Sequence, residues 1–184
     1  MALKNTTERY GWISIMLHWC VAIAVFSMFG LGLYMVELTY YDAWYKGSLD
    51  LHKSAGILLA LVVIARFVWR LSNPSPRGLS PSALENLAGH LAHLALYGLM
   101  AALFVSGYLI STADGQSIDV FGWFSVPATL TGDGQEDIAG DIHEWLAWGL
   151  ISLVGLHAAA AMKHHFINRD DTLKRMCRPD STSN

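Results

Sequence analysis

Two histidines of one long apolar stretch, His143 and His157, are spaced so that both side chains fall on one face of a helix. Fourteen residues bring a helix back to within roughly 40° of its starting direction, about 21 Å further along its axis. Ionisable side chains are expensive inside a membrane and generally mark a function there. His18 and His52 each lie near the end of another apolar segment. The chain therefore offers four imidazoles at membrane depth.

The composition indicates the elements that position these histidines. Of 184 residues, 53% are hydrophobic and only 15% are charged, which is too apolar for an ordinary water-soluble domain. A helix needs about 20 residues to cross a bilayer core, and four segments are long enough. We expect an all-α, integral-membrane four-helix transmembrane bundle that forms a single domain over residues 1–184. The expected spans cover approximately residues 12–36, 52–71, 87–112 and 142–166.

The positive charges are distributed unevenly among the connections. Basic residues lie before the first span, between the second and third spans, and after the fourth, whereas only Lys46 and Lys53 fall on the other side. The connection 113–141 carries six acidic residues and no Lys or Arg. Since cytoplasmic loops carry the excess of positive charge, we expect both termini to be cytoplasmic, in an inner membrane. The net charge of -3 gives no reason to expect a nucleic acid partner.

This orientation predicts which histidines share a depth. His18 is near the cytoplasmic end of the first span and His52 is at the outer start of the second. The fourth span begins outside, so His143 lies at its outer end and His157 lies towards the cytoplasm. Depth therefore pairs His52 with His143 and His18 with His157. One membrane histidine usually hydrogen-bonds to a neighbouring helix, but four that pair by depth favour metal ligation.

Imidazole pairs suit haem iron, and they also suit zinc or copper ions. Ion-transport sites usually combine histidine with carboxylates, and the expected spans contain almost no Asp or Glu; Glu144, beside His143, is the exception. Haem therefore fits better than a metal-ion transporter, which remains a third alternative. The chain has no Cys-x-x-Cys-His motif, so a haem would be b-type. Two imidazoles on each iron would leave no position for oxygen, and each haem would pass electrons.

His164 follows His157 by seven residues and falls on nearly the same face, about 10 Å closer to the cytoplasm. It could donate a hydrogen bond to a quinone carbonyl or carry a proton. A basic cluster with Lys163 and His165, extending towards lipid headgroups, is an equally supported interpretation. Four more residues near this end have both structural and functional interpretations. His90 and His93 could bind quinone, and Arg66 and Arg70 could pair with haem propionates.

Five short motifs form a recognisable set along the chain. They are Ser-Ile-Met-Leu-His18-Trp, His52-Lys-Ser-Ala-Gly56, Gly-His90-Leu-Ala-His93-Leu-Ala-Leu-Tyr97, His143-Glu-Trp-Leu and Gly-Leu-His157-Ala-Ala-Ala-Ala-Met-Lys-His164-His165-Phe. The set resembles the bacterial cytochrome b561 family. The resemblance implies a four-helix bundle with two b haems, ligated at His18, His52, His143 and His157, that exchanges electrons with ubiquinone. His164, the catalytic candidate, matches a histidine associated with the quinone site of the branch that oxidises superoxide.

The resemblance is compatible with two candidate electron donors. The first hypothesis is a superoxide:ubiquinone oxidoreductase that carries electrons across the lipid bilayer. The second is a haem b membrane subunit that takes electrons from a periplasmic electron-transfer protein. The acidic outer connections would repel the superoxide anion, and they suit a basic protein partner. Local capture near Lys53 and His52 is the remaining route for superoxide.

Overall fold

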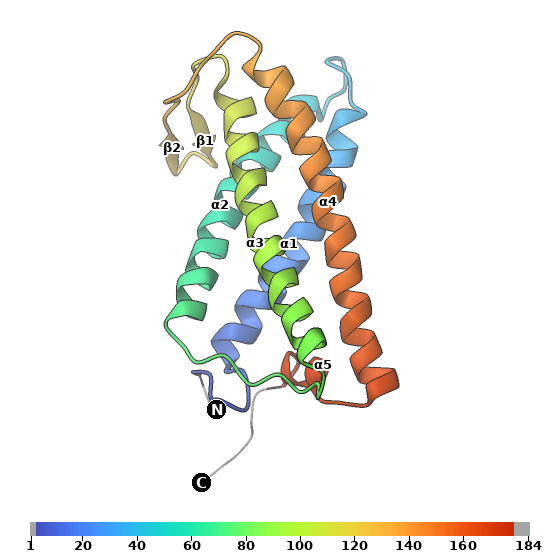
Figure 1. The fold of residues 1–184 in the computed structure, drawn as a ribbon. Coiled ribbons are helices and arrows are strands. Elements are labelled where there is room, and N and C mark those ends of the chain that lie inside the picture. Colours follow the sequence, from blue (N-terminus) through green and yellow to red (C-terminus); the bar gives the residue numbers. More distant parts are fainter. Residues whose placement is uncertain (1–2, 179–184) are drawn as a thin grey trace. The chain divides into compact units, whose positions relative to one another are not determined.

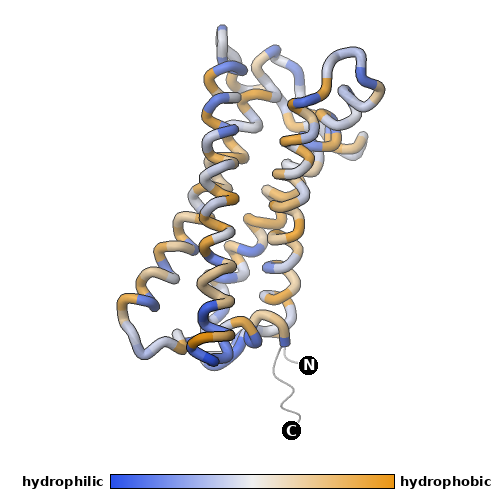
Figure 2. Tube along the Cα trace, turned by 90° about the vertical axis from the view of Figure 1, so that its right-hand side faces the viewer, coloured by the Kyte–Doolittle hydropathy of each residue, from blue (hydrophilic) through white to orange (hydrophobic). Residues whose placement is uncertain are grey.

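The computed structural model describes residues 3–178, most of which belong to four long helices (Figure 1). Each helix is long and apolar enough to cross a membrane, and Figure 2 shows hydrophobic residues along the helices and hydrophilic residues at many of their ends. The prediction of an all-α membrane protein with four transmembrane helices is confirmed. The four helices are α1 (Trp12–Val36), α2 (Tyr45–Leu71), α3 (Ala83–Thr112) and α4 (Gln135–Lys163); η1 (His164–Asn168) and α5 (Thr172–Arg175) follow.

Three of the long helices begin before the spans expected from hydropathy. Helix α2 begins at Tyr45, α3 at Ala83 and α4 at Gln135. Their first turns contain charged and polar residues, such as Glu136 and Asp137 in α4, which a search for apolar runs leaves out. Acidic side chains near a helix N-terminus are stabilised by the helix dipole, which favours the polar first turns of α3 and α4, whereas the first turn of α2 contains no acidic residue.

A small hairpin interrupts the connection between α3 and α4. Strands β1 (Ile118–Val120) and β2 (Phe124–Val126) pair antiparallel. Ser54 of α2 donates a hydrogen bond to the carbonyl of Asp119 over 3.1 Å, and Val120 is fully buried. The hairpin is therefore anchored to the part of α2 that follows His52.

The chain divides into two compact units, and each long helix contributes to both. The first unit comprises the described residues of Met1–Ala22, Val62–Leu96 and Ser152–Asn184; the second comprises Ile23–Leu61 and Tyr97–Ile151. His18, His157 and His164 fall in the first unit. His52 and His143 fall in the second.

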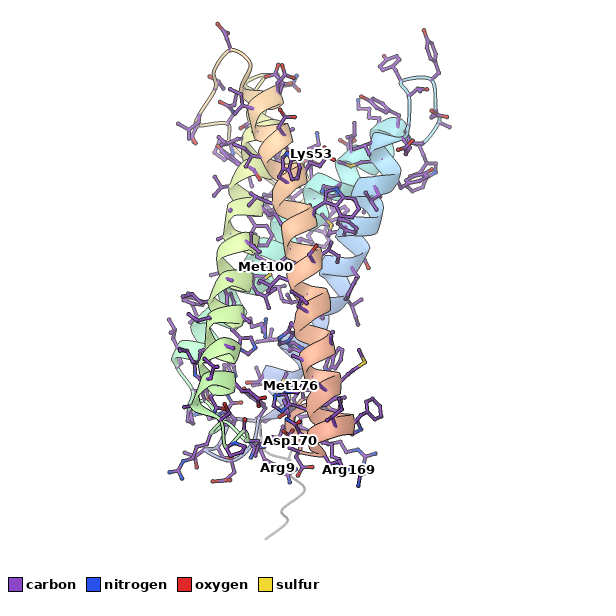
Figure 3. The ribbon with its side chains drawn as sticks, turned by 45° about the vertical axis from the view of Figure 1, so that its right-hand side comes forward. Arg9, Lys53, Met100, Arg169, Asp170 and Met176 are labelled. Carbon is purple, nitrogen blue, oxygen red and sulfur yellow. The ribbon has the colours of Figure 1, made fainter. Side chains whose placement is uncertain are left out.

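Hydrogen bonds join both ends of the described chain to the α2–α3 connection within the first unit. The Asn5 side chain donates to the carbonyl of Pro74 over 3.2 Å, and Arg175 donates to the carbonyl of Arg77 over 2.8 Å. Figure 3 labels Arg9, before α1, and Asp170, before α5, and both lie near the same end of this unit. Both terminal segments therefore lie next to the α2–α3 connection. Their cytoplasmic location stays a prediction.

Candidate functional site

The first histidine pair lies in the first unit, where His18 of α1 and His157 of α4 come together. Their ring centroids are 6.4 Å apart and their planes meet at 62°. His93 of α3 joins them, with its ring centroid 5.2 Å from that of His157. Three helices thus bring three imidazoles into one place. We call these residues, together with Arg66 of α2, the His18 cluster.

Arg66 brings a positive charge to the His18 cluster. Its Nη2 atom donates a hydrogen bond to Nδ1 of His18 over 2.9 Å. A guanidinium can only donate, so Nδ1 is the acceptor, and the proton of a neutral His18 ring lies on Nε2. Sequence reasoning noted Arg66 as a possible partner of haem propionates and missed this contact with His18.

The second histidine pair lies in the second unit and consists of His52 of α2 and His143 of α4. Their ring centroids are 6.3 Å apart and their planes meet at 71°. The buried hydroxyl of Ser106 lies 3.0 Å from Nδ1 of His143 and donates to the carbonyl of Leu103 over 3.1 Å. Because its hydrogen goes to Leu103, the Ser106 oxygen accepts the Nδ1–H of His143, which leaves Nε2 free to bind a metal. We call His52, His143 and Ser106 the His52 cluster.

A glycine lies against each ring of the His52 cluster, and at Gly107 the approach is too close for an ordinary side-chain contact. A Cβ atom on Gly32 of α1 would lie 3.6 Å from Cε1 of His52, and one on Gly107 of α3 would lie 3.2 Å from Cε1 of His143. Nδ1 of His52 is buried and, within residues 3–178, has no hydrogen-bond partner. Packing therefore positions His52, whereas both packing and a hydrogen bond position His143.

The donor sets of the two pairs fit a b-type haem. A metal ion bound about 2 Å from one nitrogen of each ring holds the two centroids roughly 6 Å apart, which agrees with 6.4 Å and 6.3 Å. In the described part of the chain, no group of three or more His, Cys, Asp or Glu side chains could hold a metal ion. A haem iron takes four ligands from its macrocycle and needs only two from the protein. The pairs therefore suit haem iron better than a bare ion.

His164 lies in η1, outside both clusters but within the first unit. Its Nδ1 atom is 2.6 Å from Oδ2 of Asp170. Lys163, at the end of α4, donates to Glu85 of α3 over 2.7 Å. Sequence reasoning missed both acidic partners, because Glu85 is distant in sequence and Asp170 follows an irregular turn.

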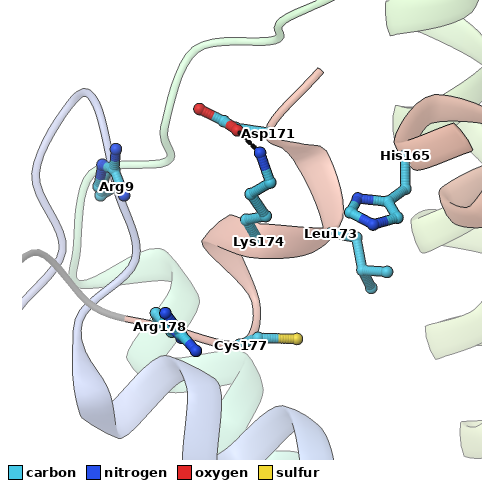
Figure 4. A pocket seen from close by; sticks show the side chains of 7 residues that line it. All are labelled: Arg9, His165, Asp171, Leu173, Lys174, Cys177 and Arg178. Atoms are coloured by element: carbon cyan, nitrogen blue, oxygen red, sulfur yellow. Dashed lines mark hydrogen bonds and ion pairs between the residues drawn. The ribbon is translucent and has the colours of Figure 1, made fainter. Parts of the chain in front are cut away.

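The remaining histidines near this end have separate surroundings. Nδ1 of His90 donates to the carbonyl of Asn86 in its own helix over 2.8 Å. Nδ1 of His165 is buried with no hydrogen-bond partner in the described chain, and this residue lines a surface pocket of the first unit (Figure 4). The other residues that line it are Arg9, Asp171, Leu173, Lys174, Cys177 and Arg178.

Comparison with known proteins identifies the family to which this chain is similar. Residues 9–179 match the family described as prokaryotic cytochrome b561. Cytochrome b561 homolog 2 of Escherichia coli is 54% identical, over 99% of this chain and 98% of its own length. Cytochrome b561 homolog 1 of the same bacterium is 30% identical, over 92% and 97%. A protein of Yersinia pestis called probable superoxide oxidase CybB is 29% identical, over 92% and 96%.

Proposed function

Because the chain belongs to the prokaryotic cytochrome b561 family, we propose that it carries electrons between a donor outside the inner membrane and ubiquinone, through two b haems. The family consists of membrane b-type cytochromes, so this chain is a multi-pass protein of the bacterial inner membrane that binds b-type haem. The number of haems, the ligands, the quinone and the donor belong to the proposal.

One observation carries the proposal of two haems. Two histidine pairs, one in each compact unit, have ring separations of 6.4 Å and 6.3 Å. In the proposal, His18 and His157 hold one iron, and His52 and His143 hold the other. A haem bound between two imidazoles supplies one-electron transfer and offers no open position for oxygen.

The neighbouring side chains orient these ligands. Ser106 fixes the ring of His143 with Nε2 unprotonated, as a ligand to iron requires. In the His18 cluster, the single proton of a neutral His18 ring must lie on Nδ1 if Nε2 is to bind iron. Nδ1 can then no longer accept the hydrogen bond from Arg66, so this hydrogen bond must break. A guanidinium can form two parallel hydrogen bonds to a carboxylate, and in the proposal Arg66 binds a haem propionate in this way.

Quinone reduction is assigned to His164, and superoxide is the first candidate donor. A quinone needs a proton donor as well as electrons, and a histidine can both donate a hydrogen bond to the carbonyl and transfer a proton. The relative called probable superoxide oxidase supports the choice of donor.

Rapid-mixing spectroscopy on the purified haem protein tests this function. Superoxide should reduce the b-type absorption bands of the oxidised protein, and a short-chain ubiquinone should reoxidise them. A His164→Ala variant should keep both haem spectra and lose most of the reoxidation rate. If ubiquinone does not reoxidise the reduced haem protein, the quinone assignment is refuted. If superoxide does not reduce the oxidised protein, superoxide is refuted as the donor.

The charges of the second unit favour a periplasmic redox protein as the second candidate donor. Lys53, beside His52, lies 3.7 Å from Asp50, so its positive field is partly cancelled. The connection 113–141 adds further acidic residues, and such a surface attracts a basic protein more readily than an anion. Reduction of the haems by a basic soluble cytochrome, with rates that fall steeply as salt is added, would favour this donor over superoxide.

A further inference from the structure

The ring of His164 is placed between two carboxylates that the haem assignments do not use. Nδ1 lies 2.6 Å from Oδ2 of Asp170, and Nε2 lies 4.0 Å from Oε2 of Glu85. The side chains of His164 and Asp170 are 18% and 19% exposed, whereas that of Glu85 is 35% exposed. Glu85 therefore has the greatest access to water of the three.

An irregular turn brings Asp170 back onto His164. The residues His164–Asn168 form a π-helical turn, and Arg169 then adopts a left-handed conformation with φ 55°. The backbone N–H of Asp170 donates to the carbonyl of His164 over 3.1 Å. Such π-helical turns and left-handed residues are uncommon and occur frequently at functional sites. Without this turn, the helix would continue and carry Asp170 away from the imidazole.

Hydrogen bonds fix both oxygens of the Asp170 carboxylate. The backbone N–H of Thr172 donates to Oδ1 over 2.9 Å, while Oδ2 contacts His164. Burial alone would raise the pKa of Asp170, but the hydrogen bonds from Thr172 and His164 outweigh it and hold the pKa below its usual value. Asp170 is therefore a carboxylate near neutral pH, and its Oδ2 atom can accept the Nδ1–H of His164.

On the other side of the ring, Glu85 is held at the first turn of α3. Lys163 donates to Oε1 over 2.7 Å, and Ser80 donates to Oε2 over 2.6 Å. The Oε2 atom that faces His164 is thus also the acceptor from a hydroxyl group. A hydroxyl that both donates and accepts can connect this carboxylate to water.

We propose that Glu85, His164 and Asp170 form a proton relay that serves quinone reduction, an inference that rests on the proposed function. His164 touches the quinone and gives up the proton on Nε2 as an O–H bond forms on the quinone. Asp170 is a positioning residue that keeps the Nδ1 proton in place and stabilises the imidazolium before each transfer. Glu85 then returns a proton from water to Nε2. Two such cycles, with two electrons from the reduced haem protein, convert a quinone into a quinol.

Adjacent aspartates provide a matched test of the relay. Asp170 contacts His164, whereas Asp171 pairs with Lys174 at 2.9 Å, so Asp170→Asn and Asp171→Asn remove the same charge one residue apart. Each variant is purified with its haem, reduced chemically, and mixed with a short-chain ubiquinone at a series of pH values. We expect Asp170→Asn to slow reoxidation about tenfold at neutral pH, which is less than the contribution of about 10²–10⁴-fold that is typical of the acid–base group itself.

Three further readouts separate a relay from a merely structural contact. The charged groups that face His164 are Asp170 and Glu85, with Lys163 bound to Glu85, and the neutral amide of Asn168 lies 3.2 Å from Nδ1. Loss of the Asp170 charge destabilises the imidazolium, so the pH profile of Asp170→Asn should move to lower pH and the rate should recover in acid. Asp170→Glu should restore part of the rate. Glu85→Gln should slow reoxidation and increase its solvent deuterium isotope effect.

The outcomes distinguish the relay from the function on which it rests. The relay is supported if Asp170→Asn is slow with a displaced pH profile while Asp171→Asn and the haem spectra match the wild type. It is overturned if both aspartate variants behave alike, even though His164→Ala remains slow, and the quinone site then survives. If His164→Ala reoxidises at the wild-type rate, both the relay and the assignment of the quinone to His164 are overturned.

Discussion

The His18 cluster and the His52 cluster share one geometry but differ in their surroundings. Ring separations are 6.4 Å and 6.3 Å, yet Arg66 and a third histidine, His93, adjoin the first pair. The second pair contacts the neutral Ser106 and lies close to two glycines. Ligand spacing decides whether iron can be held, whereas charge and hydrogen bonding around it set its reduction potential. This difference predicts a higher potential at the His18 cluster, which favours electron flow towards it.

The largest expected effect comes from removing one ligand of either cluster. His143→Ala should remove the haem of the His52 cluster and leave the other, and His157→Ala should do the reverse. Each variant should therefore contain one haem, because the two pairs lie in separate units. A pyridine haemochrome assay with protein quantification checks this. Loss of both haems from each variant would show that the two sites are not independent.

A packing change should affect only the His52 cluster. Gly107→Val places side-chain atoms where a Cβ alone would lie 3.2 Å from Cε1 of His143, and overpacking of this kind typically costs about 1–3 kcal/mol. Haem occupancy at this pair should fall. Gly98→Val, in the same helix, is the control, because nothing lies within 4 Å of a Cβ at Gly98. Equal haem loss in both variants would contradict the role given to Gly107.

The smallest expected effect is a shift in potential. Arg66→Met removes a positive charge from the His18 cluster and so should lower the midpoint potential of its haem by about 60 mV, equivalent to about 1.4 kcal/mol for one electron. The haem of the His52 cluster should not shift. Ser106→Ala, which removes a neutral hydrogen bond worth about 1 kcal/mol, should shift only that second haem and by less. Spectroscopic redox titration measures both potentials. An unchanged potential in Arg66→Met would contradict the proposal that the Arg66 charge distinguishes the two clusters.

Hydropathy and helical spacing predicted the parts of this molecule that depend on regular geometry. The four apolar runs predicted the four helices, and the fourteen residues between His143 and His157 gave two depths in one helix. The matching of His18 with His157 followed from chain direction, and the structure brings these rings together. Their role as ligands stays a prediction.

The neighbours that distinguish the two clusters could not be predicted in the same way. The contacts of Arg66 with His18 and of His93 with His157 depend on helix rotation and rotamers, which an apolar run does not determine. The acceptor role of Ser106 depends on where its hydroxyl hydrogen points. The contact of Asp170 with His164 requires an irregular turn that helical periodicity cannot detect.

The haem content of the purified wild-type protein tests the pairing most directly. Pyridine haemochrome analysis against an independent protein determination should give two b haems per chain, with the low-spin spectrum of iron bound by two imidazoles. Two haems of this kind are the result expected from one histidine pair in each unit. One haem per chain, none, or a high-spin iron with an open position would contradict two bis-histidine sites.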